Sequence, residues 1–190
     1  MSHYAAPYLF CPHCGKPLQK KIIENRSRST CPTCPYIHWG DYSLGVGGVL
    51  WHNNKVLLVQ RQHNPGKGMW TIPGGYVDHE ESIGKAIIRE IHEETGIDTL
   101  PLSIIALRDR PDERHDTYIV FRMQLLGGTL QAQPGEVSNL GFFTLEECSF
   151  LPVASLSLSA IVASRSISQG LIICSDVKLL GKLSTLYQIP

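Results

Sequence analysis

The sequence predicts an α+β protein in which helices cover a mixed β-sheet, preceded by a small zinc-binding module. Two Cys-x-x-Cys pairs lie within the first 34 residues, a pattern that is typical of a zinc ribbon. From residue 43 onward, runs rich in β-branched and apolar residues alternate with glycine and proline turns, and these runs predict strands. One segment with helical periodicity, residues 82–95, interrupts the strands.

Length and charge limit the possible architectures and partners. The chain has 190 residues, enough for one full-sized core and a small additional module. We expect the zinc ribbon at 1–40, the main domain at 41–152, and a helical or tail extension of that domain at 153–190. Seventeen basic residues balance seventeen acidic ones, so net charge favours neither a nucleic-acid nor a membrane partner.

The sequence shows no pattern typical of export or membrane insertion. The start, MSHYAAPYLFCPHC, lacks the basic and apolar regions of a secretory signal. Residues 153–175 are rich in apolar side chains, but Arg165, Gln169 and several serines interrupt any run long enough to span a bilayer. We therefore expect a cytoplasmic protein.

The cysteine spacing indicates a structural Zn²⁺ site. A gap of sixteen residues separates the two pairs, which suits a tetrahedral site with four thiolate ligands. The expected ligands are Cys11, Cys14, Cys31 and Cys34. Disulfides or Cys-x-x-Cys redox chemistry are the alternative, which a reducing compartment disfavours. The isolated Cys148 and Cys174 are expected to be semi-buried thiols.

The segment between the cysteine pairs is basic and has two interpretations. Its cations are Lys16, Lys20, Lys21, Arg26 and Arg28. They could form a nucleic-acid footprint, but a solvated hairpin within the ribbon is favoured.

The rest of the chain predicts a series of strands and two further helices. The expected strands are 43–51, 55–62, a short one within 69–77, 102–109, 116–126 and one that begins at 140. Asn53-Asn54 is expected to turn the first pair into a hairpin, and residues 110–115 are expected to form a polar turn. A helix start is expected before Cys148, and residues 152–166 predict a helix.

The helix at 82–95 carries acidic residues where apolar ones are expected. Its buried stripe is predicted to consist of Ile83, Ala86, Ile87 and Ile91. Glu90, Glu93 and Glu94 lie on or beside this stripe and not on the solvent face. Gly96 follows where a left-handed residue commonly ends a helix.

This placement is electrostatically unfavourable. Acidic side chains near the C-terminus of a helix oppose its dipole, and a carboxylate pair at about 4–5 Å costs roughly 3–4 kcal/mol at an effective dielectric constant near 20. Arg89 can pair with Glu93, but one guanidinium cannot neutralise three acids. A divalent cation can, and Mg²⁺ or Mn²⁺ suits oxygen ligands. The alternative is a solvated acidic helix end.

These residues resemble the Nudix box, Gly-x5-Glu-x7-Arg-Glu-U-x-Glu-Glu-x-Gly-U, where U is aliphatic. The positions that match it are Gly75, Glu81, Arg89, Glu90, Ile91, Glu93, Glu94, Gly96 and Ile97. The resemblance implies a Nudix hydrolase domain at 41–152 with the Nudix α/β/α sandwich. It also implies Mg²⁺-dependent hydrolysis of a nucleoside diphosphate linked to another moiety.

The resemblance also implies roles for individual acidic residues. Glu90 and Glu94, helped by Glu93, would hold the metal ion, and Arg89 would orient Glu93. Glu81 is expected either to be a further metal ligand or to reinforce the loop before the helix.

Residues outside the helix complete the implied site. Glu136 is expected to be another metal ligand or the general base, with an exposed loop acid as the alternative. Gly74 and Gly75 would let the backbone approach the substrate phosphates closely. Trp39 would stack on the substrate base, or instead pack within the protein.

The zinc ribbon ahead of this domain makes the chain similar to the NADH pyrophosphatase and ADP-ribose pyrophosphatase groups. The expected substrate is therefore ADP-ribose, NADH or FAD, with release of AMP or a mononucleotide. The S-Q-P-W-P-F-P element of the NADH group is replaced here by residues 101–116, so the substrate stays open. The alternative is a weakly catalytic nucleotide sensor whose ribbon binds nucleic acid or a protein. A homodimer through the tail at 153–190 is a further expectation.

Overall fold

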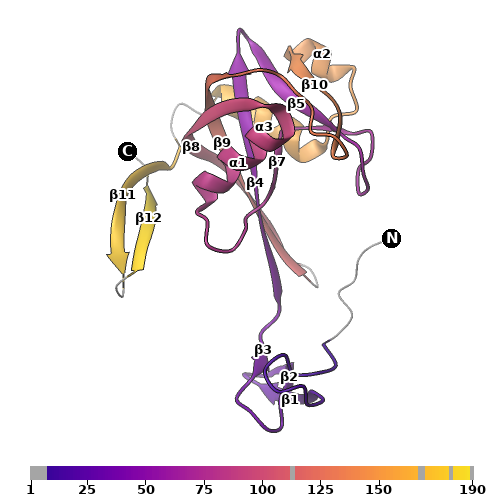
Figure 1. The fold of residues 1–190 in the computed structure, drawn as a ribbon, viewed down its shortest axis with the longest axis vertical. Coiled ribbons are helices and arrows are strands. Elements are labelled where there is room, and N and C mark those ends of the chain that lie inside the picture. The colour runs from indigo at the N-terminus through magenta and orange to yellow at the C-terminus, as the bar shows by residue number, and fades with distance from the viewer. Residues whose placement is uncertain (1–7, 112–113, 167–169, 180–181, 189–190) are drawn as a thin grey trace. The chain divides into compact units, whose positions relative to one another are not determined.

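The computed structural model describes residues 8–111, 114–166, 170–179 and 182–188. The chain divides into two compact units, Met1–Asp41 and Tyr42–Pro190. The elements of the first unit are β1 (Gln19–Ile23), β2 (Arg26–Thr30) and β3 (Ile37–His38). Those that follow, shown in Figure 1, are β4 (Asp41–His52), β5 (Lys55–Arg61), β6 (Trp70–Thr71), β7 (Gly74–Tyr76), α1 (Ile83–Thr95), β8 (Ile97–Arg110), β9 (Arg114–Gly128), β10 (Val137–Phe143), α2 (Leu145–Ser149), α3 (Ser155–Ser166), β11 (Ile172–Leu179) and β12 (Lys182–Gln188).

The first unit is a three-stranded antiparallel sheet in the order β1-β2-β3. Glu24 and Asn25 turn β1 into β2 with positive φ angles of 49° and 61°, as a tight hairpin requires. Four of the five basic residues between the cysteine pairs are exposed. The predicted hairpin is therefore confirmed.

The second unit is built on a sheet in the order β10-β5-β4-β9-β8, with β6 beside β5 and β7 beside β4. The Asn53-Asn54 turn between β4 and β5 has φ angles of 48° and 60°. This confirms the hairpin expected at that position.

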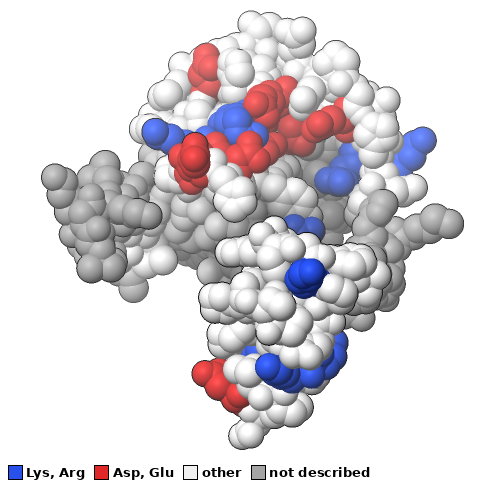
Figure 2. Space-filling view, turned by 60° about the horizontal axis from the view of Figure 1, so that its bottom comes forward, with Lys and Arg blue, Asp and Glu red and all other residues white. Residues whose placement is uncertain are grey.

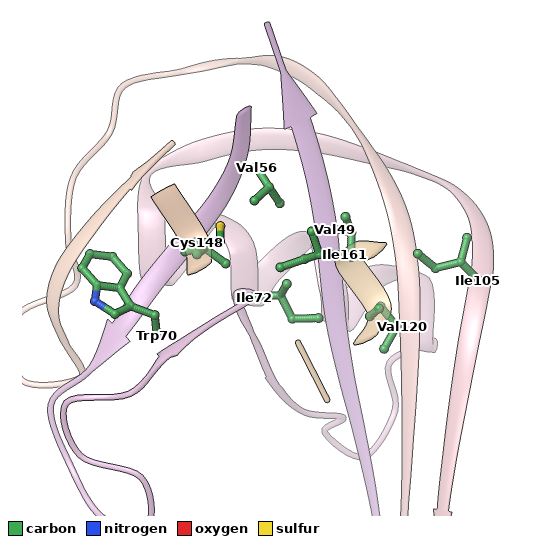
Figure 3. Packing of buried hydrophobic residues seen from close by; sticks show 10 residues of the cluster. Val49, Val56, Trp70, Ile72, Ile105, Val120, Cys148 and Ile161 are labelled. Atoms are coloured by element: carbon green, nitrogen blue, oxygen red, sulfur yellow. The ribbon is translucent and has the colours of Figure 1, made fainter. Parts of the chain in front are cut away.

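Two hydrophobic clusters lie on opposite faces of this sheet, because successive side chains of a strand point in opposite directions. On one face Val46, Leu50 and Leu57 pack with the apolar stripe of α1. On the other, Val49 and Leu58 join a cluster that includes residues of α2 and α3, part of which Figure 3 shows. The sheet is thus covered by helices on both faces, which confirms the predicted α/β/α sandwich.

The strands β8 and β9 are longer than predicted. Arg114 and His115, expected within a turn, begin β9 instead, and β8 starts at Ile97, directly after α1. Arg110 pairs with Asp116 at the far end of this ladder. The polar residues at these positions continue the ladder because its backbone pairing does not depend on apolar side chains.

The C-terminal region departs in part from the expected helical extension. The helix predicted at 152–166 is confirmed as α3, and the start of α2 is capped by Thr144 and Glu147. Beyond α3, however, β11 and β12 form an antiparallel pair, and Leu171 bridges Ile104 of β8. Cys148 is buried, whereas the side chain of Cys174 lies outside the described residues. No helix in the described ranges is long and apolar enough to cross a membrane.

Candidate functional site

Four cysteine side chains of the first unit converge on one point. The Sγ atoms of Cys11 and Cys34 are 3.5 Å apart, as are those of Cys14 and Cys31, and all four lie within 4.8 Å of one another. A zinc–sulfur bond of about 2.3 Å places the sulfurs of a tetrahedral site roughly 3.8 Å apart. The residues therefore fit Zn²⁺. The thiols are free, so the disulfide alternative is not supported.

The Thr33 side chain supports this centre. Its hydroxyl lies 3.3 Å from the sulfur of Cys31 and 3.5 Å from that of Cys14. The hydrogen bond from Thr33 is the largest of the effects that lower the pKa of Cys31 to about 6. A lowered thiol pKa favours the thiolate, which is the form that binds metal.

The acidic helix α1 begins and ends where its sequence predicts. The Ser82 hydroxyl accepts a hydrogen bond from the backbone amide of Lys85 at 3.3 Å and caps the N-terminus. Gly96, with φ of 71°, ends the helix in the left-handed conformation. Strand β8 follows at once, so the last turn of α1 is held against the sheet.

Arg89 binds several of the acids around α1. Its guanidinium donates hydrogen bonds to Glu81 at 2.6 Å, Glu90 at 2.8 Å and Glu93 at 3.1 Å. It also donates to the carbonyl oxygen of Tyr76 at 3.1 Å, which ties the helix to β7. On the face in Figure 2, red acidic side chains gather around blue basic ones. Arg89 was expected to orient Glu93, and it holds two further carboxylates as well.

Glu81 reinforces the loop that leads into the helix. Besides Arg89, it accepts a hydrogen bond from the backbone amide of Asp78 at 2.9 Å. The hydrogen bond with Arg89 is the main reason that the pKa of Glu81 is lowered. Of the two roles open for Glu81, these contacts favour the loop role.

Glu94 is the buried acid of the group. Only 9% of its surface is exposed, and its Oε2 accepts a hydrogen bond from the backbone amide of Gly74 at 2.8 Å. Burial raises its pKa to about 8, opposed by the Gly74 amide and reinforced by the charges of Glu90 and Glu136. Burial likewise raises the pKa of Glu90, although Arg89 opposes that shift.

Glu93 does not lie where the helical pattern placed it. It was expected on or beside the buried stripe, but its side chain is 44% exposed and bonds Arg89 on the outer surface of α1. The prediction of three inward-facing carboxylates is therefore wrong for Glu93, while it is confirmed for Glu94.

Gly74 and Gly75 bring the backbone of β7 up against the acids. A Cβ atom on Gly75 would stand 2.5 Å from the Glu90 carboxylate. A Cβ atom on Gly74, whose φ is 151°, would stand 2.1 Å from the carbonyl oxygen of Val46. A side chain at Gly75 would therefore displace the Glu90 carboxylate, and one at Gly74 would displace the backbone of β4.

Glu136 and Glu94 line the same pocket, of about 160 Å³. The pocket is also lined by Arg61 and His63, which are not among the residues predicted for the site. Val137 pairs with Arg61 between β10 and β5, and this pairing brings Glu136 to the pocket. A sequence signal existed, since Arg61 ends a buried strand and His63 begins a loop that contains two glycines.

Trp39 lies in the first unit. The residue is 51% exposed, and the guanidinium of Arg28 lies over its ring at 4.5 Å. Arg28 also donates a hydrogen bond to the carbonyl oxygen of Trp39 at 2.8 Å. These contacts fix the residue within the ribbon.

The acids fit a hard divalent cation, because Mg²⁺ commonly takes one or two carboxylates and fills its remaining positions with water and phosphate. Glu90 and Glu94 supply two, and Glu94 lies in a buried position where its charge needs compensation. Within the described residues, the four cysteines are the one group of three or more His, Cys, Asp or Glu side chains whose ligand atoms already lie close enough together to hold an ion. A cation bound at Glu90 would compete with the hydrogen bond that Arg89 donates to this carboxylate at 2.8 Å.

Removal of the Arg89 guanidinium should destabilise the protein. We expect Arg89→Met to lower the free energy of unfolding by about 1–3 kcal/mol, less than for a fully buried pair because Arg89 is 29% exposed. Urea denaturation measures this. Lys85→Met, an exposed change on the same helix, should stay within about 0.5 kcal/mol of the parent. Equal losses in both variants would contradict the assigned role.

The pKa of Glu94 predicts a pH-dependent stability in the absence of added divalent ions. Between its ordinary pKa of 4.5 and about 8, the folded protein keeps a proton that the unfolded chain releases. Stability should therefore fall as pH rises through this range, by at most about 1.4 kcal/mol per pH unit from this group. Urea denaturation from pH 5 to pH 8 should show a steeper decline for the parent than for Glu94→Gln. Parallel profiles would exclude Glu94 as the cause.

Comparison with known proteins agrees with this geometry. Residues 41–160 match the NUDIX domain family, and residues 9–39 match the Nudix N-terminal zinc-ribbon family. An ADP-ribose pyrophosphatase from Methanocaldococcus jannaschii is 36% identical over 121 residues, which are 62% of this chain and 69% of that protein. The NAD-capped RNA hydrolase NudC of Stutzerimonas stutzeri is 27% identical over 149 residues, which are 78% of this chain and 52% of that protein.

Solved structures show the same fold. The crystal structure of a NUDIX hydrolase from Nitrosomonas europaea superposes with a TM-score of 0.73 at 26% identity, covering 80% of this chain and 87% of the other. The chain belongs to the Nudix hydrolase family and is an enzyme of that family that carries an N-terminal zinc ribbon. The chain spans only about half the length of the NudC protein it matches.

Proposed function

We propose that the protein hydrolyses the pyrophosphate bond of a nucleoside diphosphate linked to another moiety, of the ADP-ribose, NADH or FAD type, and releases AMP or a mononucleotide. Mg²⁺ or Mn²⁺ is the proposed cofactor, held by Glu90 and Glu94. The names of the relatives support this substrate class, since one is an ADP-ribose pyrophosphatase and another an NAD-capped RNA hydrolase.

The observation that carries the proposal is the buried carboxylate of Glu94. A structural acid in that position would be costly, because burial and the charges of Glu90 and Glu136 all disfavour its ionised form. Arg89 bonds Glu81, Glu90 and Glu93, whereas the hydrogen bond to Glu94 comes from an uncharged amide. The arrangement therefore suits a site that a cation completes.

The polar residues of the pocket and the two glycines beside Glu94 have proposed roles in the reaction. Arg61 and His63 donate hydrogen bonds to the diphosphate oxygens, and Gly74 and Gly75 keep the backbone close to them. Glu136 accepts the proton of the attacking water. The water oxygen bonds to one phosphorus, the bridging P–O bond breaks, and two phosphate monoesters leave. The cation, when bound, offsets the charge of the phosphates and favours ionisation of water.

Three further predicted residues have supporting roles in this proposal. Glu93 holds Arg89, and Arg89 with Glu81 fixes the loop between β7 and α1. Glu93 enters the site as a metal ligand only if its bond to Arg89 is released.

The test is turnover of a substrate panel by the full chain. ADP-ribose, NADH, FAD and dinucleoside polyphosphates are incubated with Mg²⁺, and AMP release is measured. We expect at least one compound to be hydrolysed, and hydrolysis to cease without a divalent ion. Binding of ADP-ribose without turnover of any compound would overturn the proposal and favour a nucleotide sensor.

A further inference from the structure

The side chain of Tyr118 in β9 fills a notch that glycines leave in the sheet. Strand β9 lies next to β4, and the Tyr118 ring runs along Gly45 and Gly47 of that strand. A Cβ atom at Gly45 would stand 2.5 Å from the ring, and one at Gly47 would stand 2.6 Å from the hydroxyl oxygen. Glycine weakens the interior of a strand and often marks a close approach by another group. These two glycines therefore make room for the ring of Tyr118.

The hydroxyl end of this ring reaches the short strand β7. Gly47 pairs with Gly74, and a Cβ atom on Gly74 would stand 2.8 Å from the Tyr118 hydroxyl oxygen. The backbone amide of Gly74 in turn donates the hydrogen bond to Glu94 at 2.8 Å. The backbone at Gly74 therefore lies between the tyrosine and the buried acid.

Tyr118 and Glu94 approach Gly74 from opposite faces of the sheet. Tyr118 packs against the hydrophobic cluster that includes Ile72 and Val120, both shown in Figure 3. Glu94 belongs to α1, whose apolar stripe packs against the cluster on the other face. Tyr118 thus supports the far side of the backbone that the buried acid binds.

Strand β7 needs such support because its own pairing is short. It comprises Gly74–Tyr76, and its antiparallel pairing with β4 covers three positions. Two of its three residues are glycines, whose backbone has the widest conformational freedom. Contacts from other elements must therefore help to determine where the Gly74 amide lies.

The surroundings of Tyr118 keep its hydroxyl uncharged. Burial is the largest of the effects that raise its pKa, and the charge of Glu94 raises it further. Arg108, whose guanidinium lies 5.3 Å from the centre of the ring, opposes these effects. A neutral hydroxyl can pack behind Gly74 without adding charge repulsion to the buried acid.

We propose that Tyr118 is a positioning residue of the active site, which holds the Gly74 amide against Glu94 and thereby orients the carboxylate for the divalent cation. This proposal rests on the proposed function, because that function assigns Glu94 to the cation. Groups that hydrogen-bond a metal ligand fix its orientation and affect metal affinity. Without the ring, β7 would settle into the notch, and the bond from Gly74 to Glu94 would lengthen.

The test compares Tyr118→Leu and Tyr118→Phe in the full chain. We expect Tyr118→Leu to weaken Mg²⁺ binding, measured by calorimetry, by about 10-fold. For the substrate that the panel identifies, kcat should fall by about 10- to 100-fold while KM stays unchanged. In the metal-free protein, the Gly74 amide should exchange with solvent faster than in the parent. Tyr118→Phe keeps the ring, so all of these changes should be much smaller.

Phe143→Leu is the control for loss of an aromatic ring from the same cluster. Phe143 of β10 packs against this cluster, and its ring meets Trp70 edge-on at 4.8 Å. This variant should lower Tm as Tyr118→Leu does, but Mg²⁺ binding and Gly74 exchange should match the parent. Equal weakening of Mg²⁺ binding in the two variants, or unchanged binding in Tyr118→Leu, would overturn the proposal.

Failure of this inference can be distinguished from failure of the proposed function. If the parent hydrolyses a compound of the panel, and Tyr118→Leu does so with unchanged kcat and unchanged Gly74 exchange, the function stands and the positioning role is wrong. If the parent hydrolyses no compound, but Tyr118→Leu alone weakens Mg²⁺ binding and speeds Gly74 exchange, the positioning role stands and the hydrolase proposal is wrong.

Discussion

Replacement of Glu94 by glutamine is expected to lower Mg²⁺-dependent hydrolysis by about 1000-fold, or about 4 kcal/mol in the activation free energy. Glutamine keeps the size of the side chain, and its oxygen can still accept the hydrogen bond from Gly74. The change therefore removes one negative charge from the site with little effect on packing. Turnover of ADP-ribose under saturating Mg²⁺ measures the effect.

Glu93→Gln is the matched control for this experiment. It removes the same charge from the same helix turn, but from a side chain that is 44% exposed and bonded to Arg89. We expect a loss of about 10-fold or less. A larger loss for Glu93→Gln than for Glu94→Gln would contradict the assignment of the buried acid as the principal ligand.

The second large effect is expected in the zinc centre. Cys31→Ser should reduce bound zinc from about one equivalent to a small fraction, and residues 9–39 should lose their fixed structure. Zinc binding contributes roughly 10–16 kcal/mol in small domains of this kind. Among residues 8–41, the buried hydrophobic side chains are those of Cys11 and Cys31 themselves, so the apolar core offers little to replace this contribution. Elemental analysis measures the metal, and amide exchange of residues 9–39 measures the fold.

Cys148→Ala is the control for loss of a cysteine. This thiol is buried in the sheet–helix cluster of the second unit, whereas the four ligands belong to the first unit. The variant should retain about one equivalent of zinc. Full zinc retention in Cys31→Ser would exclude a four-cysteine site.

The local features of the site could be predicted from the sequence. Ser82 and Gly96 define the ends of α1 through capping and backbone conformation, which depend on neighbouring residues only. The cysteine spacing similarly defines the ribbon, because two residues between each pair allow both sulfurs to reach one ion. These rules depend on neighbouring residues alone, so they hold regardless of the tertiary contacts of the chain.

Features that depend on tertiary neighbours could not be predicted in this way. A helical wheel places Glu93 about 90° from the centre of the buried stripe, at the boundary between the buried and exposed faces. There the hydrogen bond from Arg89 determines which way the side chain points. Arg61 and His63 reach Glu94 through the pairing of β5 with β10, which are far apart in sequence. The β11–β12 pair depends on the edge of β8, to which Leu171 is bridged.

The contact between the backbone amide of Gln62 and the carbonyl oxygen of Glu136, at 2.9 Å, limits how related chains can differ. The segment between β9 and β10 is held as well, because the backbone amides of Thr129, Gln131 and Gln133 donate hydrogen bonds to carbonyl oxygens at the end of α1 and at Gly96. A shift of β10 by one residue along β5 would break this alignment and turn the Glu136 side chain to the opposite side of the sheet. Insertions and deletions among related chains should therefore be rare at 129–136, and the alignment of these two strands should stay constant.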